Sequence, residues 1–313
     1  MLKRIAFLIA FLVLVASCGG TGTAGPIATA SAVVKASQSA PAFPTSVTDF
    51  QNRSVAISKR PERIVSIGPS NTEFLFALGA GDRVVGADDY SDEPAAAKTK
   101  EHVGGVKVNL EKVASLRPDL IVTVKFSDGT IEALTQLGAA VLVVDPQGLP
   151  DVPKTAILLG QAVGADGRTL AGDIQKQIDA VIAKTQTAPK PRVFHEVDAS
   201  DLTKMYTVGP NSFIDDLIKI AGGVNIAAGA KTQYPTISAE EVVKADPEIV
   251  VLGDSGYGTT VAEVAARPGW SAMTAVTSKR VYPVPGNLFS RPGPRVGTAA
   301  LEYAKLVHPE LFR

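Results

Sequence analysis

The sequence has little cysteine, little histidine and no excess of charge of either sign. Among 313 residues it has one cysteine, three histidines, and 31 basic residues balanced by 31 acidic ones. A single cysteine excludes an internal disulfide framework and a cysteine-rich zinc site. The balanced charge, with no Lys/Arg cluster beyond the first residues, argues against a nucleic-acid partner. With 45% hydrophobic residues, the length favours about two domains with ordinary cores.

The N-terminus lacks an apolar run long enough to cross a membrane comfortably. Lys3 and Arg4 precede an apolar run, 5–15, which is typical of a secretory signal. The residues 15–18, Val-Ala-Ser-Cys, fit the bacterial lipoprotein cleavage pattern, in which the cysteine becomes the lipidated first residue. We therefore expect a signal peptide at 1–18, lipidation of Cys18, and an extracytoplasmic protein anchored at the periplasm or cell surface. A free cysteine beside an ordinary signal-peptidase site is the alternative.

The following segment, 19–48, lacks the residues that build a core. It consists almost wholly of small and polar residues, with Lys35 as its only charge in the stretch from Gly19 to Thr48. Such a composition predicts a flexible tether between membrane and domain. An edge strand or hairpin is expected next, around Val47 to Ser58.

One long amphipathic helix divides the rest of the chain. From Asp166 to Lys184, apolar residues recur at the three-to-four spacing that lines one helix face. The five residues of this predicted face are Leu170, Ile174, Ile178, Val181 and Ile182.

The segments before and after this helix resemble each other. In 109–122 and again in 238–251, a capping residue is followed two places on by Glu, a short helix stops before Pro, and an apolar strand begins. This duplication predicts two related lobes, 49–160 and 189–313, joined by a connecting helix within 161–188.

Strands and helices alternate with short loops in both halves. This pattern predicts an α/β fold of two lobes, each with a central mostly parallel sheet flanked by helices, joined by one long helix. The strands are expected at 63–67, 84–87, 120–124, 141–144, 192–197, 249–252 and 281–284. A helix should follow the first strand, with Ser, Thr and Asn at 70–72 available to cap it, and a last helix should span 294–307.

Ligands of such sheets gather at the carboxyl ends of the strands, so two facing lobes would surround one cleft. From the first lobe the candidate residues are Pro69, Ser70, Asn71, Tyr90, Gly104, Gly105, Lys125 and Phe126. From the second lobe they are His195, Tyr206, Tyr234, Asp254, Tyr257, Asn287, Phe289 and Arg291.

These residues carry a family resemblance that covers the chain from about Arg63 to its end. The motifs are 70–73 (SNTE), 90–92 (YSD), 109–111 (NLE), 118–121 (PDLI), 234–235 (YP) and 291–295 (RPGPR). In this order and spacing the chain resembles the substrate-binding proteins of ABC importers for cobalamin, haem and iron-siderophores, and looks closest to the cobalamin-binding branch. The resemblance implies a transported ligand, with no catalytic cofactor and no resident metal. It also implies a monomer that delivers its ligand to a permease dimer and its ATPase subunits.

The resemblance assigns a role to two glutamates, one on each lobe. Glu111 and Glu240 match the family's surface glutamates, which meet arginine pockets on the two permease subunits. Exposed carboxylates at a fixed separation would steer and orient docking. The plainer interpretation is that each Glu favours a helical first turn because of the helix dipole.

Other matches imply ligand contacts. Tyr90 and Tyr234 match aromatic positions that flank the corrin ring, and Asn287 and Arg291 fall where polar contacts come from the second lobe. Two departures concern 104–106, Gly-Gly-Val, where the cobalamin binders carry an aromatic residue and the haem binders carry a ligating Tyr. The expected ligand-binding set is Ser70, Asn71, Tyr90, Phe126, His195, Tyr234, Asn287 and Arg291.

Several alternatives stay open at this point. His195 could coordinate cobalt or iron from a strand end, or be a hydrogen-bonded histidine beside the sheet. A hydrolase using Ser255 is suggested by 253–256, Gly-Asp-Ser-Gly, but this motif follows a buried strand and Tyr257 breaks the G-x-S-x-G elbow. Three scattered histidines disfavour a zinc or manganese receptor. An iron-siderophore or haem receptor shares the fold and the transport role.

Overall fold

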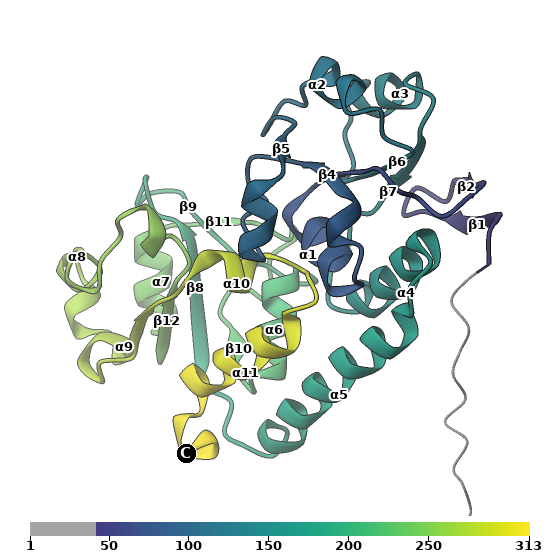
Figure 1. Cartoon of the computed structure of the whole chain (residues 1–313). Coiled ribbons are helices and arrows are strands. Elements are labelled where there is room, and N and C mark those ends of the chain that lie inside the picture. The colour runs from purple at the N-terminus through teal and green to yellow at the C-terminus, as the bar shows by residue number, and fades with distance from the viewer. Residues whose placement is uncertain (1–41) are drawn as a thin grey trace, which may run out of the picture. The chain divides into compact units, whose positions relative to one another are not determined.

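The computed structural model describes residues 42–313 of the chain (Figure 1). The predicted signal peptide, Cys18 and most of the predicted tether lie outside the described residues. Within 42–313, no helix combines the length and the apolar character needed to cross a membrane. Strand β1 (Thr45–Thr48) pairs antiparallel with β2 (Ser54–Ile57), which confirms the expected hairpin. Because β1 begins at Thr45, the last residues of the segment expected to be a tether are folded.

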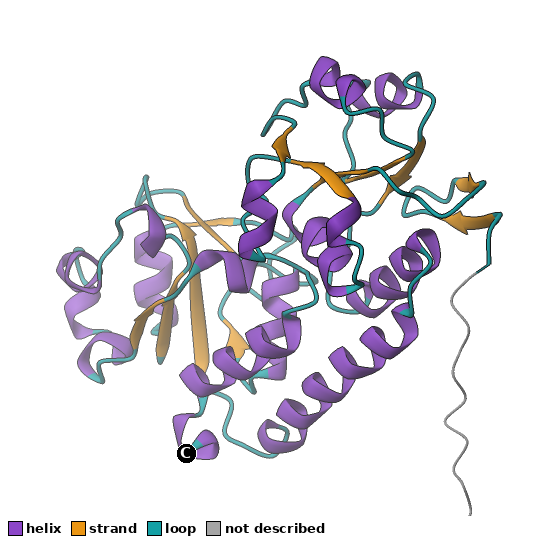
Figure 2. Cartoon of the chain, in the orientation of Figure 1, coloured by secondary structure: helices purple, strands orange, loops and turns teal. Residues whose placement is uncertain are grey.

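The first lobe is built on a wholly parallel five-stranded sheet in the order β5-β4-β3-β6-β7. Its strands are β3 (Ile64–Ile67), β4 (Val84–Ala87), β5 (Glu101–His102), β6 (Leu120–Thr123) and β7 (Ala140–Val143). Successive side chains of a strand point to opposite faces, so Ile64 packs with α1 (Pro69–Ala77) and Val65 packs with α2 (Leu110–Ser115) and α3 (Thr130–Thr135). The helices therefore cover both faces of the sheet (Figure 2).

The second lobe has a mixed sheet in the order β11-β9-β8-β12-β13, with β10 also paired to β8. Its strands are β8 (Arg192–Asp198), β9 (Met205–Thr207), β10 (Val224–Asn225), β11 (Thr236–Ile237), β12 (Ile249–Leu252) and β13 (Val281–Pro283). The antiparallel pairs are β8 with β9 and β9 with β11, and the other pairs are parallel. One face packs on α6 (Phe213–Ile220) and α11 (Val296–Val307), and the other on α7 (Ala239–Ala245), α8 (Val261–Ala266) and α9 (Thr274–Thr277).

The long connecting helix is α5 (Gly167–Thr185), capped by Asp166, whose carboxylate accepts the amide N–H groups of Arg168 and Thr169 at 3.1 Å. The prediction of its buried face was partly wrong. Ile182 is 38% exposed, and Leu170 is only partly buried. The stripe that is buried follows the three-to-four spacing through Gly167, Ala171, Ile174, Ile178, Val181 and Thr185. At about 100° per residue, Ile182 lies roughly 60° from the centre of that stripe, at its edge.

A second helix, α4 (Asp151–Val163), lies against α5 and was not predicted. The two helices cross closely because of glycine: a Cβ on Gly167 would stand 2.0 Å from the carbonyl oxygen of Ala156. Helix α11 packs on α5 as well (Figure 1). One hydrophobic core therefore runs from the first sheet through α4 and α5 to α6 and α11 of the second lobe. The connection is a packed layer of helices and not an isolated rod.

The two lobes repeat one local arrangement at a separation of 129 residues. Arg63 donates its amide N–H to Asp119 at 2.9 Å and its Nε–H to the carbonyl oxygen of Leu116 near the end of α2. Arg192, 129 positions later, donates its amide N–H to Glu248 at 2.9 Å and its Nε–H to a carbonyl oxygen at the end of α7, 3.2 Å away. The duplication read from the sequence therefore extends to individual hydrogen bonds.

Candidate functional site

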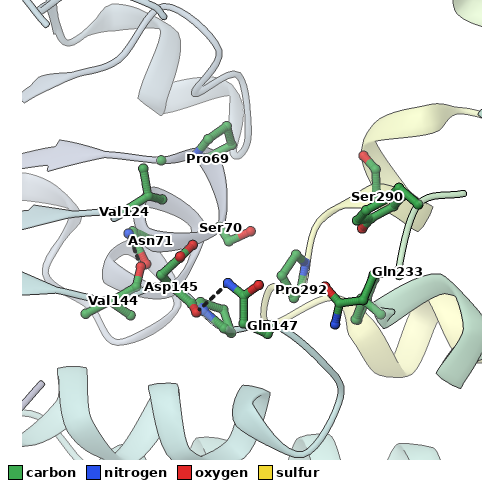
Figure 3. Close-up of a pocket in the computed structure, with 14 residues that line it drawn as sticks. Pro69, Ser70, Asn71, Val124, Val144, Asp145, Gln147, Gln233, Ser290 and Pro292 are labelled. Atoms are coloured by element: carbon green, nitrogen blue, oxygen red, sulfur yellow. Dashed lines mark hydrogen bonds between the residues drawn. The ribbon is translucent and has the colours of Figure 1, made fainter. Parts of the chain in front are cut away.

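A cavity of about 230 Å³ lies where the two lobes face each other (Figure 3). The first lobe contributes the segments that follow strands β3, β6 and β7, as expected for a parallel sheet. The second lobe contributes the start of α6, the segment before β11, and the region at the end of α10 (Gly286–Ser290). The lining residues are Gly68, Pro69, Ser70, Asn71, Val124, Val144, Asp145, Pro146, Gln147, Phe213, Gln233, Tyr234, Ser290 and Pro292.

Helix α1 starts at this cavity through a glycine. Gly68 has φ 115°, and a Cβ there would lie 2.7 Å from Cγ1 of Val124, so both conformation and space call for glycine. The expectation that Ser70, Asn71 or Thr72 caps the helix was wrong, because Pro69 is already the first helical residue and no side chain caps it. Ser70 and Asn71 instead lie in the first turn, where both line the cavity.

Asn71 ties the ends of two strands together beneath the cavity. It is 1% exposed, and its Nδ2 group donates to the carbonyl oxygens of Val144 at 3.0 Å and Ile67 at 3.3 Å. Its Oδ1 has no hydrogen-bond partner among the described residues. A buried acceptor without a donor costs free energy, so this oxygen is available to a donor that enters the site.

Sequence reasoning missed Asp145 and Gln147, although both directly follow a buried strand. Asp145 is half-buried, and burial raises the pKa of its carboxyl group against the opposing effect of Lys125. Gln147 donates its Nε2 group to the backbone oxygen of Asp145 at 3.1 Å (Figure 3). The rule that selected Ser70 and Asn71, polar residues at the carboxyl end of a strand, would also have selected these two.

The aromatic candidates separate into exposed and packed side chains. Tyr90 is 54% exposed and Tyr234, which lines the cavity, is 50% exposed. Phe126 instead packs against the core of the first lobe on the α2 and α3 side. Tyr206 and Tyr257 are 50% and 95% exposed and do not line the cavity.

Beside the cavity, a network of ion pairs bridges the lobes. Glu73 of α1, with a side chain only 3% exposed, accepts two hydrogen bonds from Arg295 at 2.7 and 2.8 Å. Arg291 pairs with Glu73 and with Asp92, and it also donates to the backbone oxygen of Tyr90 at 3.0 Å. Asp92 further accepts from Nδ2 of Asn287 at 2.8 Å.

This network occupies two of the expected ligand contacts. The donors of Arg291 and Asn287 are directed at first-lobe carboxylates, and neither residue lines the cavity. In this conformation they therefore hold the lobes together. Sequence reasoning missed the partners, Glu73 and Asp92, because an ion pair across some 200 residues leaves no local pattern.

His195 does not lie in the cleft, which corrects the expectation that it could face a ligand. It is 2% exposed, and its ring stacks on Tyr303, with Nδ1 of His195 3.0 Å from the Tyr303 hydroxyl oxygen. Complete burial lowers the pKa of His195 to about 3, so the ring is neutral near pH 7. The hydrogen-bonded interpretation weighed for this residue is the one that the structure supports. Among the described residues, no group of three or more His, Cys, Asp and Glu side chains is placed to hold a metal ion.

The remaining candidates lie apart from the cavity lining. Phe289 is buried against Tyr303, with ring centroids 5.4 Å apart, and Asp254 is 6% exposed and accepts from Thr259. Ser255, the suggested nucleophile, donates its hydroxyl group to the backbone oxygen of Val284 at 2.9 Å. The other three, Gly104, Gly105 and Lys125, are also absent from the lining.

Glu111 and Glu240 occupy equivalent places in the two lobes, each exposed in the first turn of its helix. The neighbouring helix caps are satisfied by other groups: Asn109 accepts the amide of Lys112 at 3.0 Å, and Ser238 forms a capping box with Glu241. Neither Glu111 nor Glu240 has a hydrogen-bond or ion-pair partner within 42–313, so both carboxylates are accessible to a partner.

Comparison with known proteins identifies a family and relatives with similar sequences. The family model described as periplasmic binding protein matches residues 64–288. An uncharacterized ABC transporter substrate-binding lipoprotein of Bacillus subtilis is 35% identical over 289 residues, which cover 89% of this chain and 90% of that protein. A cobalamin-binding protein of Halobacterium salinarum is 31% identical over 85% of this chain and 74% of its own length.

A solved structure agrees with these relatives. A possible iron-binding, periplasmic solute-binding protein of Staphylococcus epidermidis has a TM-score of 0.69 and 26% identity, covering 80% of this chain and 100% of that one. The family model and the Bacillus relative describe solute binding for transport and not an enzymatic activity. The chain therefore belongs to the periplasmic binding protein family, as an ABC-transporter substrate-binding protein of the group that binds cobalamin, haem and iron compounds.

Proposed function

We propose that this protein captures cobalamin between its two lobes and delivers it to an ABC permease. The observation that carries the proposal is a pair of exposed tyrosines from opposite lobes. Tyr234 lines the cavity, and Tyr90 belongs to the loop that Arg291 holds beside it. Aromatic faces that project into solvent suit a large planar ligand, because they offer apolar contact area at little conformational cost.

The size of the cavity suggests how such a ligand sits. A volume of about 230 Å³ is below the roughly 300–1,000 Å³ of sites that enclose a drug-sized molecule. A corrin ring therefore rests at the mouth, between the tyrosines, while a side arm enters the cavity. Because α5 packs on both α4 and α11, we expect only a small hinge motion to accommodate the ring.

The names of the relatives supply two candidate ligands. The Halobacterium relative is named for cobalamin, whereas the Staphylococcus structure is named for iron. An iron-siderophore or haem is therefore the second candidate ligand. Receptors for either kind of ligand share this fold and the transport role.

Titration calorimetry against cyanocobalamin, haemin and a ferric siderophore tests the proposal. We expect saturable one-to-one binding of cyanocobalamin, tighter than that of the other two. Tighter binding of haemin or the siderophore would overturn the cobalamin assignment. Tryptophan fluorescence is a poor substitute, because Trp270 is fully buried in the core of the second lobe and does not line the cavity.

The proposal includes delivery and attachment. Glu111 and Glu240 dock the monomeric protein onto a two-fold permease that its ATPase subunits drive, and lipidated Cys18 holds it at the outer face of a membrane. Incorporation of a labelled fatty acid tests the anchor: the native chain should be labelled and Cys18→Ser should not. Equal labelling of both would reject Cys18 as the lipidation site.

A further inference from the structure

The cavity between the lobes presents hydrogen-bond acceptors from both of its walls. Three carboxamide side chains line it, Asn71 and Gln147 from the first lobe and Gln233 from the second, together with the carboxyl group of Asp145 (Figure 3). Within the described part of the chain, none of its lining residues is Lys, Arg or His. Its only ionisable side chains are therefore an acidic one, Asp145, and the phenol of Tyr234.

The orientation of each carboxamide is fixed by the backbone. The NH₂ group of Asn71 donates to Val144 O at 3.0 Å, that of Gln147 to Asp145 O at 3.1 Å, and that of Gln233 to Asn211 O at 2.7 Å. Turning any of these amides over would place one oxygen against another, which is unfavourable. Asn71 also donates to Ile67 O at 3.3 Å, so both of its N–H groups are engaged, whereas Gln233 keeps one N–H group. The carbonyl oxygens of all three carboxamides are left for a ligand.

Asp145 adds to this acceptor character. Its carboxyl group is half-buried, and burial raises its pKa against the opposing effects of Lys125 and of a hydrogen bond from the Gln147 side chain. A carboxylate in such a place is stabilised by an incoming N–H or O–H donor. A second carboxylate brought beside it would be destabilised by like-charge repulsion at reduced dielectric.

Donors are present, but they are few and neutral. Ser70 and Ser290 offer hydroxyl groups, and the first turn of α1 has amide N–H groups without helical partners. These donors suit a carbonyl oxygen. A group that offers one carbonyl oxygen and two N–H donors matches both sets at once, and that group is a primary carboxamide.

We propose that this cavity, lined by Asn71, Asp145, Gln147 and Gln233, recognises a primary carboxamide arm of the ligand and rejects the corresponding carboxylate. The inference rests on the proposed function in placing a corrinoid at the mouth, because peripheral amide arms are the groups that such a ring would insert. It also separates the candidate ligands, since a porphyrin with propionate arms carries the disfavoured group.

Matched pairs of ligands test this. Cyanocobalamin is compared by calorimetry with its monocarboxylic acid derivatives, in which one peripheral amide has been hydrolysed, each positional isomer separately. An iron(III) porphyrin with propionate arms is compared with the same porphyrin carrying propionamide arms. We expect the amide to bind about tenfold tighter than the acid for at least one corrinoid position, and for the porphyrin pair if it binds at all.

Asp145→Asn is the informative variant, because it keeps the shape and supplies a donor in place of a charge. We expect it to reduce the amide-to-acid ratio to about twofold, and Asp145→Ala to do the same. Asp173→Asn removes an equal charge from the exposed face of α5, where Asp173 pairs with Lys176, and should leave the ratio unchanged.

The outcomes separate the two proposals. Equal or tighter binding of every acid, or a ratio that Asp145→Asn does not alter, would overturn the carboxamide site while leaving cobalamin binding intact. If no corrinoid binds but the porphyrin with propionamide arms binds more tightly than the one with propionate arms, cobalamin is rejected as the ligand and the carboxamide site is kept. Binding of none of the probes would reject both.

Discussion

The two lobes share the hydrogen bonds and the register at the starts of their central strands, and they differ in the parts that face the cavity. Arg63 and Arg192 make the same pair of hydrogen bonds, and β3 meets β6 in the register with which β8 meets β12. At the rims the correspondence ends. The first lobe leads from its strand into Gly68 and helix α1, whereas β8 extends to Asp198 and pairs with the antiparallel strand β9.

The difference extends to the interior of equivalent strands. Ser66 in β3 corresponds to His195 in β8, and Ile67 corresponds to Glu196, which is buried and paired with Arg267. A duplicated fold therefore keeps the groups that set strand register and varies the groups inside the strands and beyond their ends. This suits a protein with one asymmetric ligand and, as proposed here, one two-fold symmetric partner.

We expect the largest effect on stability from removing the ion-pair network that bridges the lobes. In Glu73→Ala, Arg295 and the largely buried Arg291 lose a shared carboxylate, and we expect a loss of about 3 kcal/mol in the free energy of unfolding. Urea denaturation measures it. If the lobes were independent halves, unfolding would instead separate into two transitions.

An exposed ion pair supplies the control for this variant. Glu302 pairs with Lys305 on α11 at 2.7 Å, with both side chains 42% exposed. Glu302→Ala should cost less than about 0.5 kcal/mol. A loss for Glu73→Ala as small as this one would show that the bridge contributes little to stability.

The equivalent residues Ser66 and His195 differ in that only His195 can take up a proton, so the pH dependence of stability tests this difference. Burial lowers the pKa of His195 to about 3, below its ordinary value of 6.5, so the unfolded chain takes up this proton first as pH falls. Stability from this group is complete above pH 6.5 and decreases toward pH 3. The slope approaches about 1.4 kcal/mol per pH unit below pH 6.5, which gives about 2 kcal/mol between pH 6.5 and 4.5.

Urea denaturation of the native chain and of His195→Gln at several pH values measures this slope. For the variant, the free energy of unfolding should change less steeply with pH, by the equivalent of about one proton in that range, whatever its stability at pH 7. Parallel curves would mean that His195 is accessible to protons in the folded protein.

Most of the fold follows from local patterns in the sequence. The strand 249–252 is a continuous apolar run bounded by turn residues, and the caps Asn109 and Ser238 mark helix starts that the structure confirms. Helix α4 was not predicted because it follows Pro150 and precedes Gly164, and no side chain caps its start. On α5 the predicted face was partly wrong: Leu170 and Ile182 lie at the edges of the buried stripe, and the small residues Gly167 and Ala171, which carry no strong apolar signal, were missed.

The site was less predictable because it depends on how distant segments meet. Ser70, Asn71 and Tyr234 could be selected as residues at strand ends, and the structure brings them to one cavity. The pairing of Arg291 with Glu73 and Asp92 could not be read locally. His195 was misjudged because β8 carries its side chain into the core beside Tyr303, a distinction that depends on the face of the strand.

The proposed docking glutamates test whether the lobes are equivalent toward a partner. In the double variant Glu111→Ala and Glu240→Ala we expect ligand affinity to be unchanged and transporter-dependent uptake to fall about tenfold or more. Calorimetry and uptake of labelled ligand into cells or proteoliposomes measure the two quantities. Loss of affinity would contradict the docking role, and normal uptake would also contradict it.

The smallest effect tests the repeat at its two helix caps. Asn109 and Ser238 each accept an amide N–H in the first turn of a docking helix, at 3.0 and 3.2 Å. Asn109→Ala and Ser238→Ala should each lower the free energy of unfolding by about 1 kcal/mol. Ser238→Ala should cost slightly more, because it also removes a partner of Glu241 in the capping box. A loss at only one site would show that the two helices, although alike in sequence and position, do not contribute equally to their lobes.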